Sequence, residues 1–179
     1  MLKGERVLLR PMMPEDIACK HEYNQDMELA VLTCDTPRVS PPERAQSFYE
    51  IWTKPDDDFA GFIIEADGKY IGDCCLGNLR ERHGSLELGI AICDPAYWSK
   101  GYGREVVNLL LDYGFRSLGA RRIWLTCHSK NERAIRSFKS CGFIEEGRPR
   151  KAIWVAGAYI DLVDMSMLRD EWLASHSKF

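Results

Sequence analysis

The chain has 179 residues, of which 45% are hydrophobic and 28% charged, with a formal net charge of −3. This length suggests one domain that can bury a core without a metal or disulfides. The mixture excludes a disordered chain, and the slight negative charge argues against a partner such as nucleic acid or a membrane surface. No apolar run reaches the roughly 18 residues of a membrane span, and residues 1–10 lack a signal-type apolar core, so we expect a cytoplasmic protein.

Seven cysteines occur, an odd number without a Cys-x-x-Cys pair. In a reducing compartment such residues are usually small hydrophobic core side chains. Cys127 and His128 are adjacent and would point to opposite faces of a strand, which makes a poor chelate. We therefore expect no metal site.

In chain order, residues 7–10 predict a first strand, and Pro14 opens a helix, because proline suits the first helical turn. Residues 33–42 are polar, contain three prolines and predict a loop, in which Ser40 would cap a second helix that ends near Trp52.

Two apolar runs, 59–66 and 70–76, flank Asp67-Gly68, which is a strong hairpin signal between strands. Residues 86–93 predict a strand that places alternate apolar residues on one face. Residues 101–118 predict a helix that ends at Gly119, and its expected buried stripe is Val107, Leu110, Leu111, Gly114 and Leu118.

Residues 121–127 predict another strand, after which Asn131 would cap a helix that ends at Gly142. The tail predicts a last hairpin, 148–155 and 159–168, that turns at Ala156-Gly157. This order of elements indicates an α+β domain with one central sheet and a β-α-β crossover.

The segment Trp98-Ser99-Lys100-Gly101-Tyr102-Gly103-Arg104 follows a strand and opens a helix. Glycines let the backbone approach a ligand closely. The free N–H groups and the dipole of a first helical turn favour an anion such as phosphate, and Lys100 and Arg104 would add positive charge. Without a ligand the same residues would simply start a helix. The pattern is not a Walker A loop, because no Gly-Lys-Ser/Thr follows a four-residue spacer. It is not a dinucleotide fingerprint either, because position 106 is Val where that motif needs Gly.

Four stretches resemble, in order, the GNAT superfamily of N-acetyltransferases, and within it the RimJ/RimL branch that acetylates ribosomal-protein N-termini. They are residues 5–10 with Glu15-Asp16, residues 87–90 through 97–103, residues 131–134 through 141–143, and the tail from Glu146-Gly147 to Glu171-Trp172.

The resemblance implies one GNAT domain over residues 1–179, with an acetyl-CoA core at about 86–143 and an acceptor side at about 14–53 and 148–168. Its fold would be α+β: a central mixed, mostly antiparallel sheet of about seven strands with a splayed parallel pair, flanked by about four helices.

The resemblance also implies that acetyl-CoA lies where strands 86–93 and 121–127 splay apart. Its pantetheine arm would pair with the backbone near Ile90 and Ile92, as an added strand would, and its diphosphate would lie on the loop. The residues expected to bind it are Ile90, Ile92, Trp98, Ser99, Lys100, Gly101, Tyr102, Gly103, Arg104, Asn131 and Phe138.

Three positions depart from the superfamily pattern. Trp98 stands where a Gln or Arg is usual, and Ala134 stands where some members have Ser. Phe138 stands where many members have a Tyr that protonates the departing thiolate. A phenyl ring cannot donate a proton, so we expect Phe138 to pack on the thioester end.

Direct transfer to an amine needs a base, and Glu87 on the splayed strand is the candidate, a role that burial would favour. Its alternative role is a solvated carboxylate or an arginine partner, and His83 and His128 are the other candidate bases. The backbone N–H of Ile90 or Ala91 could hold the oxyanion.

The acceptor is open between a protein N-terminal amine and a polyamine, aminoglycoside or other small amine, and a catalytically inactive CoA-binding sensor is a further alternative. Residues 14–38 hold six acids against two bases, which favours a cationic acceptor if they line the cleft. The acids are Glu15, Asp16, Glu22, Asp26, Glu28 and Asp35. The resemblance allows a homodimer, but no residue requires one.

Overall fold

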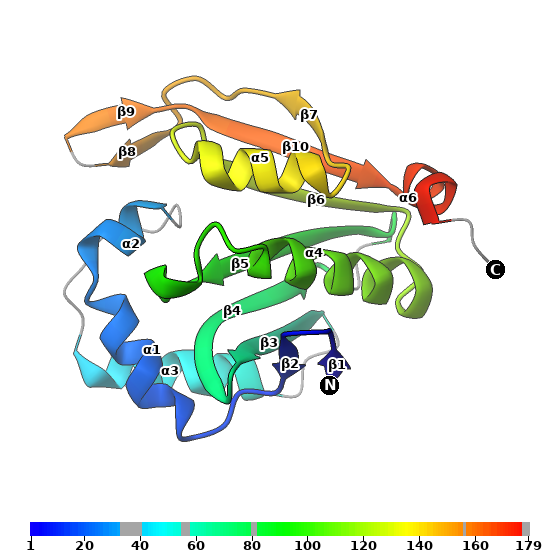
Figure 1. Cartoon of the computed structure of the whole chain (residues 1–179). Helices are drawn as coiled ribbons and strands as arrows, with labels where there is room; N and C mark the ends of the chain where they lie inside the picture. The colour runs from blue at the N-terminus through cyan, green and yellow to red at the C-terminus, as the bar shows by residue number, and fades with distance from the viewer. Residues whose placement is uncertain (33–40, 55–57, 80–81, 156, 177–179) are drawn as a thin grey trace.

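The computed structural model describes residues 1–32, 41–54, 58–79, 82–155 and 157–176, which form a mixed sheet with helices on both faces (Figure 1). Eight strands make this sheet in the order β1-β2-β3-β4-β5-β6-β10-β7. They are β1 (Leu2–Lys3), β2 (Leu8–Arg10), β3 (Phe59–Ala66), β4 (Lys69–Gly77), β5 (Ser85–Ile92), β6 (Arg122–His128), β7 (Ile144–Gly147) and β10 (Leu162–Leu168). A separate hairpin joins β8 (Ile153–Val155) and β9 (Ala158–Ile160).

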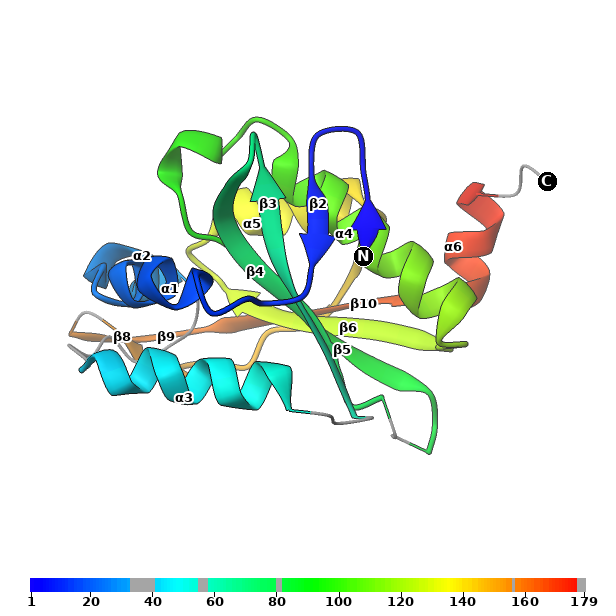
Figure 2. The ribbon, with the colours of Figure 1, turned by 90° about the horizontal axis from the view of Figure 1, so that it is seen from below.

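Six α-helices lie in the described residues: α1 (Asp16–Asn24), α2 (Met27–Leu32), α3 (Pro42–Thr53), α4 (Tyr102–Asp112), α5 (Glu132–Ser140) and α6 (Arg169–His176). A 3₁₀ turn at Pro95–Tyr97 precedes α4, and a π turn at Tyr113–Ser117 follows it. Helices α4 and α5 cover one face of the sheet, and α1 and α3 lie on the other (Figure 2). None of these helices has the length and apolarity needed to cross a bilayer.

Two apolar layers hold the helices to the sheet. The larger layer packs α4 and α5 on the sheet, with Leu110, Phe115 and Ile123 fully buried. In the smaller layer, α1 is also tied to β4 by an ion pair, Lys20 Nζ to Asp73 Oδ2 at 2.7 Å. The Tyr70 hydroxyl donates to the same carboxylate oxygen at 2.7 Å. Buried ion pairs need such added hydrogen bonds to offset desolvation, so this group fixes where α1 lies.

Several local predictions are confirmed. Strands β3 and β4 flank Asp67 and Gly68, whose φ angles are +53° and +70°. Asn131 caps α5 by accepting the Ala134 N–H at 3.1 Å, and Gly142 ends the segment with φ at +97°. The mixed, mostly antiparallel sheet with one parallel pair is also as expected, with eight strands among the described residues.

Other predictions are wrong. Leu118 is 37% exposed instead of buried, because the π turn adds a residue to the last turn and rotates this side chain outward. The predicted strand at 148–155 is only β8, and the preceding β7 pairs with β10. The sequence did not predict β1, α2 and α6, because these elements are too short to show a clear hydrophobic periodicity. Ser40, Asp35 and Ala156 lie outside the described residues.

Candidate functional site

The parallel strands β5 and β6 pair over only three residues and then separate. Their last register pair is Glu87 with Trp124. Beyond it, β5 stays paired with β4 up to Ile92, while β6 stays paired with β10 up to His128. Beyond this point β5 and β6 therefore no longer pair with each other, although each stays paired with its neighbour on the other side. The two strands present unpaired backbone edges to each other across a gap.

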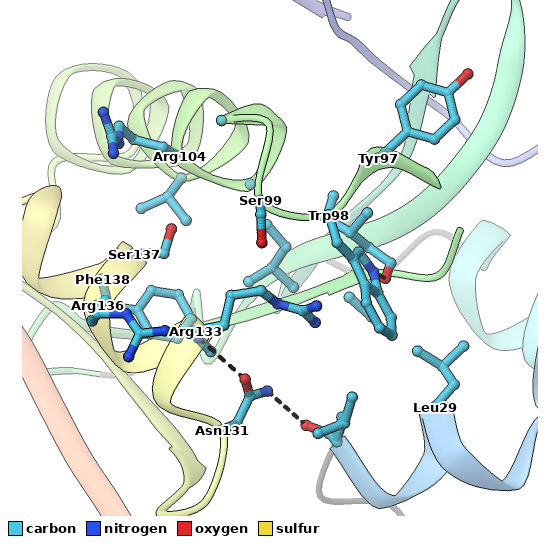
Figure 3. Close-up of a pocket in the computed structure, with 18 residues that line it drawn as sticks. Leu29, Tyr97, Trp98, Ser99, Arg104, Asn131, Arg133, Arg136, Ser137 and Phe138 are labelled. Atoms are coloured by element: carbon cyan, nitrogen blue, oxygen red, sulfur yellow. Dashed lines mark hydrogen bonds between the residues drawn. The ribbon is translucent and has the colours of Figure 1, made fainter. Parts of the chain in front are cut away.

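A pocket of about 280 Å³ occupies the region where the gap meets the starts of α4 and α5 (Figure 3). Nine of the residues expected to bind acetyl-CoA line it: Ile90, Ile92, Trp98, Ser99, Gly101, Gly103, Arg104, Asn131 and Phe138. Lys100 and Tyr102 do not line this pocket; both border a separate surface hollow. Other residues line the pocket that the sequence did not predict as binding residues: Leu29 and Leu32 of α2, Tyr97, Val107, and Arg133, Arg136 and Ser137 of α5.

The loop before α4 is shaped to present backbone N–H groups to this pocket. Gly101 is the N-cap of α4 with φ at +90°, and Ser99 also has a positive φ, +57°. A non-glycine residue in this region is uncommon and tends to mark a functional constraint. The first helical hydrogen bond runs from Glu105 N to Gly101 O, so the N–H groups before residue 105 have no partner within α4. This arrangement is a ready-made anion site.

The turn between β1 and β2 clamps that loop from outside the pocket. The Arg6 guanidinium donates to Lys100 O at 2.9 Å and to Glu105 Oε2 at 3.0 Å, and the Arg6 backbone N–H donates to Glu105 Oε1 at 2.8 Å. Burial alone would raise the pKa of Glu105, but the hydrogen bonds from Arg6 and Val7 outweigh it and lower the pKa. The N-terminal motif therefore supports the loop rather than the acceptor side.

Trp98 ties the loop to the open edge of β5. Its indole N–H donates to Ile92 O at 2.7 Å, so this carbonyl of the open edge already accepts one hydrogen bond from the protein. The guanidinium of Arg133 lies over one face of the indole, with its Cζ 3.8 Å from the ring centroid. Trp98 thus links β5, the loop and α5 around the pocket.

Asn131 connects the start of α5 to the end of α2. While its side-chain oxygen caps α5, its Nδ2 donates to Leu32 O at 3.3 Å (Figure 3). This contact, with Leu29 and Leu32 on the pocket wall, brings α2 over one end of the gap. Phe138 lies at the opposite wall, buried and packed on Phe143 with ring centroids 5.9 Å apart.

These features match a known family over most of the chain. Residues 6–144 match the model of the acetyltransferase (GNAT) domain. The chain belongs to the GNAT family of acetyltransferases. It is an N-acetyltransferase, and acetyl-CoA is its cosubstrate.

The similarity to individual proteins extends along the whole chain. The spermidine N(1)-acetyltransferase of Escherichia coli K12 is 26% identical over 178 residues, 98% of this chain and 93% of that protein. The prophage-derived uncharacterized N-acetyltransferase YokL of Bacillus subtilis is 27% identical over 176 residues, 97% of this chain and 96% of that protein. The crystal structure of the Vibrio cholerae spermidine N-acetyltransferase with CoA and spermine superposes with a TM-score of 0.85, at 25% identity, and covers 95% of this chain and 99% of that one.

In this acetyltransferase Glu87 lies on the sheet face that carries α1 and α3. Residues alternate along a strand, so Glu87 shares this face with Ala91, whose register partner on β4 is Asp73. Asp73 is the residue that holds Lys20 of α1. Its side chain is exposed, so burial does not support the role of a base, and Glu87 is not among the pocket-lining residues.

The two histidines differ. His83 is exposed in the turn before β5, away from the pocket-lining residues. His128 is 1% exposed at the end of β6, and neither ring nitrogen has a hydrogen-bond partner within the described part of the chain. Burial, with a smaller effect of nearby Lys130, lowers the pKa of His128, so the ring is neutral at neutral pH.

The acids counted near the N-terminus are not all available to a ligand. Asp16 is buried and holds Arg10 at 2.7 Å, and Asp26 accepts the N–H groups of Glu28 and Leu29 at 2.9 and 3.0 Å. Glu15, Glu22 and Glu28 are exposed. Asp26 is exposed as well, and Asp35 lies outside the described residues, so four of the five described acids lie at the surface, one of which already accepts backbone N–H groups of α2. No cluster of three metal-ligating side chains occurs in the described ranges.

Proposed function

We propose that this acetyltransferase transfers the acetyl group to a small polycationic amine of the polyamine class. The observation that carries the proposal is the similarity along almost the full length of both chains to spermidine N-acetyltransferases, one of them solved with CoA and spermine. Such an acceptor carries several ammonium groups, and its binding depends on carboxylates near the reacting end.

The charges on α1 and α2 support this acceptor. Lys20 is the one lysine or arginine between residues 16 and 32, and Asp73 neutralises it. The exposed carboxylates of Glu22 and Glu28 remain on these helices. The surface that α1 and α2 add to the acceptor side is therefore negative, which attracts a cation and repels an acidic peptide.

We infer a direct transfer in which the amine attacks the thioester carbonyl from the face that carries Glu87. The amine nitrogen forms a bond to the carbonyl carbon, and the backbone N–H of Ile90 or Ala91 stabilises the oxygen as it gains charge. Glu87 accepts the proton that the amine nitrogen loses, either directly or through one water. The C–S bond then breaks, and the thiolate leaves and takes a proton from water, because Phe138 offers none.

The test is an acceptor panel in which released thiol is followed and products are identified by mass. The panel contains spermidine, spermine, an aminoglycoside, and a peptide with a free N-terminal alanine, each at equal concentration with saturating acetyl-CoA. We expect kcat/KM to be highest for a polyamine. A higher value for the peptide would replace this proposal with protein N-terminal acetylation, and acetyl-CoA binding without turnover of any amine would replace it with a CoA-binding sensor.

A further inference from the structure

The wall of the pocket that we propose for acetyl-CoA carries an arginine that pairs with no carboxylate among the described residues. Among the described residues that line the pocket, three are arginines and none is aspartate or glutamate. Arg136 pairs with Glu132 at 3.0 Å, whereas no carboxylate in the described chain pairs with Arg133. Burial lowers the pKa of Arg133, and no neighbouring acid opposes that effect. A half-buried cation without a counter-charge is costly, so it points to an anionic ligand.

The position of Arg133 is fixed by Trp98. The guanidinium carbon lies 3.8 Å from the indole centroid, and the indole N–H is bonded to Ile92 O at 2.7 Å. The indole plane is thus anchored to β5, and the guanidinium lies on it. Stacking uses the face of a guanidinium and leaves its N–H donors free at the edge. In Figure 3 the Arg133 side chain extends from α5 across the pocket toward Trp98, below Ser99.

We propose that Arg133, which lies over the indole ring of Trp98, is a phosphate-binding residue of the acetyl-CoA site. A planar fork with free N–H donors fits two phosphate oxygens at once, which a lysine or a lone backbone N–H cannot do. The anion would lie between this fork and the N–H groups of the loop that begins at Ser99 and enters α4 at Gly101. The inference rests on the acetyl-CoA chemistry of the proposed function and does not depend on the identity of the acceptor.

Coenzyme A offers two sources of phosphate, the diphosphate and the 3′-phosphate of the ribose. The experiment is therefore calorimetric titration, without any acceptor amine, of coenzyme A and of 3′-dephospho-coenzyme A into the full-length wild type and its variants at fixed ionic strength. Arg133→Gln removes the charge and the fork. Arg136→Gln is the matched control, because Arg136 lines the same wall on the same helix but already holds Glu132.

We expect Arg133→Gln to weaken coenzyme A binding by roughly 10- to 100-fold, the range for a charged hydrogen-bonded contact, and Arg136→Gln by less than about 3-fold. If Arg133 binds the diphosphate, Arg133→Gln should also weaken the binding of 3′-dephospho-coenzyme A. If Arg133 binds the 3′-phosphate, the variant and the wild type should bind 3′-dephospho-coenzyme A with equal affinity. Arg133→Lys, which keeps the charge without the stacked fork, should bind with intermediate affinity.

An unchanged affinity of Arg133→Gln for coenzyme A would overturn the proposal. An equal loss of affinity in Arg136→Gln would overturn it as well, because the loss would then reflect the net positive charge of the pocket and not a specific contact of Arg133. Thermal unfolding of each variant shows whether the fold is retained. Because no acceptor is present, a protein that binds coenzyme A but acetylates no polyamine would overturn the proposed acceptor and leave the Arg133 result interpretable.

Discussion

Gly101 and Gly103 both line the pocket proposed for acetyl-CoA, but the structure gives them different constraints, which a pair of alanine substitutions can separate. Gly101 has φ at +90°, and an added Cβ would lie 3.1 Å from Arg6 Nη2. Gly103 lies within α4 without a positive φ, and its added Cβ would meet only Ile92 Cγ1 at 3.9 Å.

The magnitudes follow from these geometries. A non-glycine residue in the left-handed region costs about 1–2 kcal/mol, and displacement of Arg6 would weaken its bond to Lys100 O by up to about 1 kcal/mol. We expect Gly101→Ala to lose about 2 kcal/mol, a fall in Tm of about 4–8 °C for a domain of this size. Gly103→Ala should keep its Tm or gain up to about 1 kcal/mol, because alanine is the better helix former.

Both methyl groups would stand where a phosphate approaches the backbone, so both variants should bind acetyl-CoA at least about 10-fold more weakly, about 1.4 kcal/mol. Differential scanning fluorimetry gives the Tm values and calorimetry the affinities. Gly147→Ala, with no atom within 4 Å of the added Cβ and no place in the pocket, is the control. Wild-type affinity in Gly103→Ala would refute a phosphate on this backbone, and an unchanged Tm in Gly101→Ala would refute the strain argument.

Three other predictions concern titratable groups. Glu87→Gln should lower kcat by roughly 10²- to 10⁴-fold without changing acetyl-CoA affinity, and a kcat and pH–rate profile like those of the wild type would exclude it as the base. Because the pKa of Glu105 is lowered in the folded protein, this carboxylate stabilises the fold above the usual pKa of a glutamate, and the stabilisation is lost as pH falls through the folded pKa. In Glu105→Gln, the free energy of unfolding in urea should therefore fall less steeply as the pH is lowered through the acidic range. A pH dependence like that of the wild type would contradict this. Because the pKa of His128 is lowered in the folded protein, the fold loses stability as pH falls below the ordinary histidine pKa of about 6.5. His128→Leu should remove this pH-dependent loss and should have a Tm at pH 7 equal to or above that of the wild type, because the buried imidazole has no partner among the described residues. A large fall in Tm would instead indicate a hydrogen-bond partner for the imidazole.

Local chemistry explains what could be predicted from the sequence. The Asp67-Gly68 turn and the Asn131 cap each depend on residues within about four positions, and both are confirmed. The wrong expectations depend on distant partners. Glu87 was placed on the correct strand, but its burial depends on how far α1 and α3 extend over the sheet.

Charge tallies along the chain fail for the same reason. Residues 14–38 look acidic, yet Asp16 is neutralised by Arg10, and the one cation of α1, Lys20, is neutralised by Asp73, 53 positions away. In the pocket, Arg133 meets Trp98 across 35 positions, and it lacks an acidic partner among the described residues. No local sequence pattern can indicate either feature. Short-range spacing therefore predicted the loop, while the charges that act on a ligand had to be read from the fold.

The absence of a phenol at position 138 is consistent with the proton chemistry of the reaction. A free thiol has a pKa near about 8.5, so a thiolate can depart near neutral pH without a positioned acid. An alkylamine has a pKa near about 10.4 and is almost fully protonated at pH 7, so the difficult proton is the one on the acceptor. In the proposed transfer, the catalytic demand therefore falls on the face that carries Glu87, whereas Phe138 is buried against Phe143 and packs in the pocket wall. The pH–rate profile of such an enzyme rises with amine and base deprotonation and has no alkaline limb from residue 138.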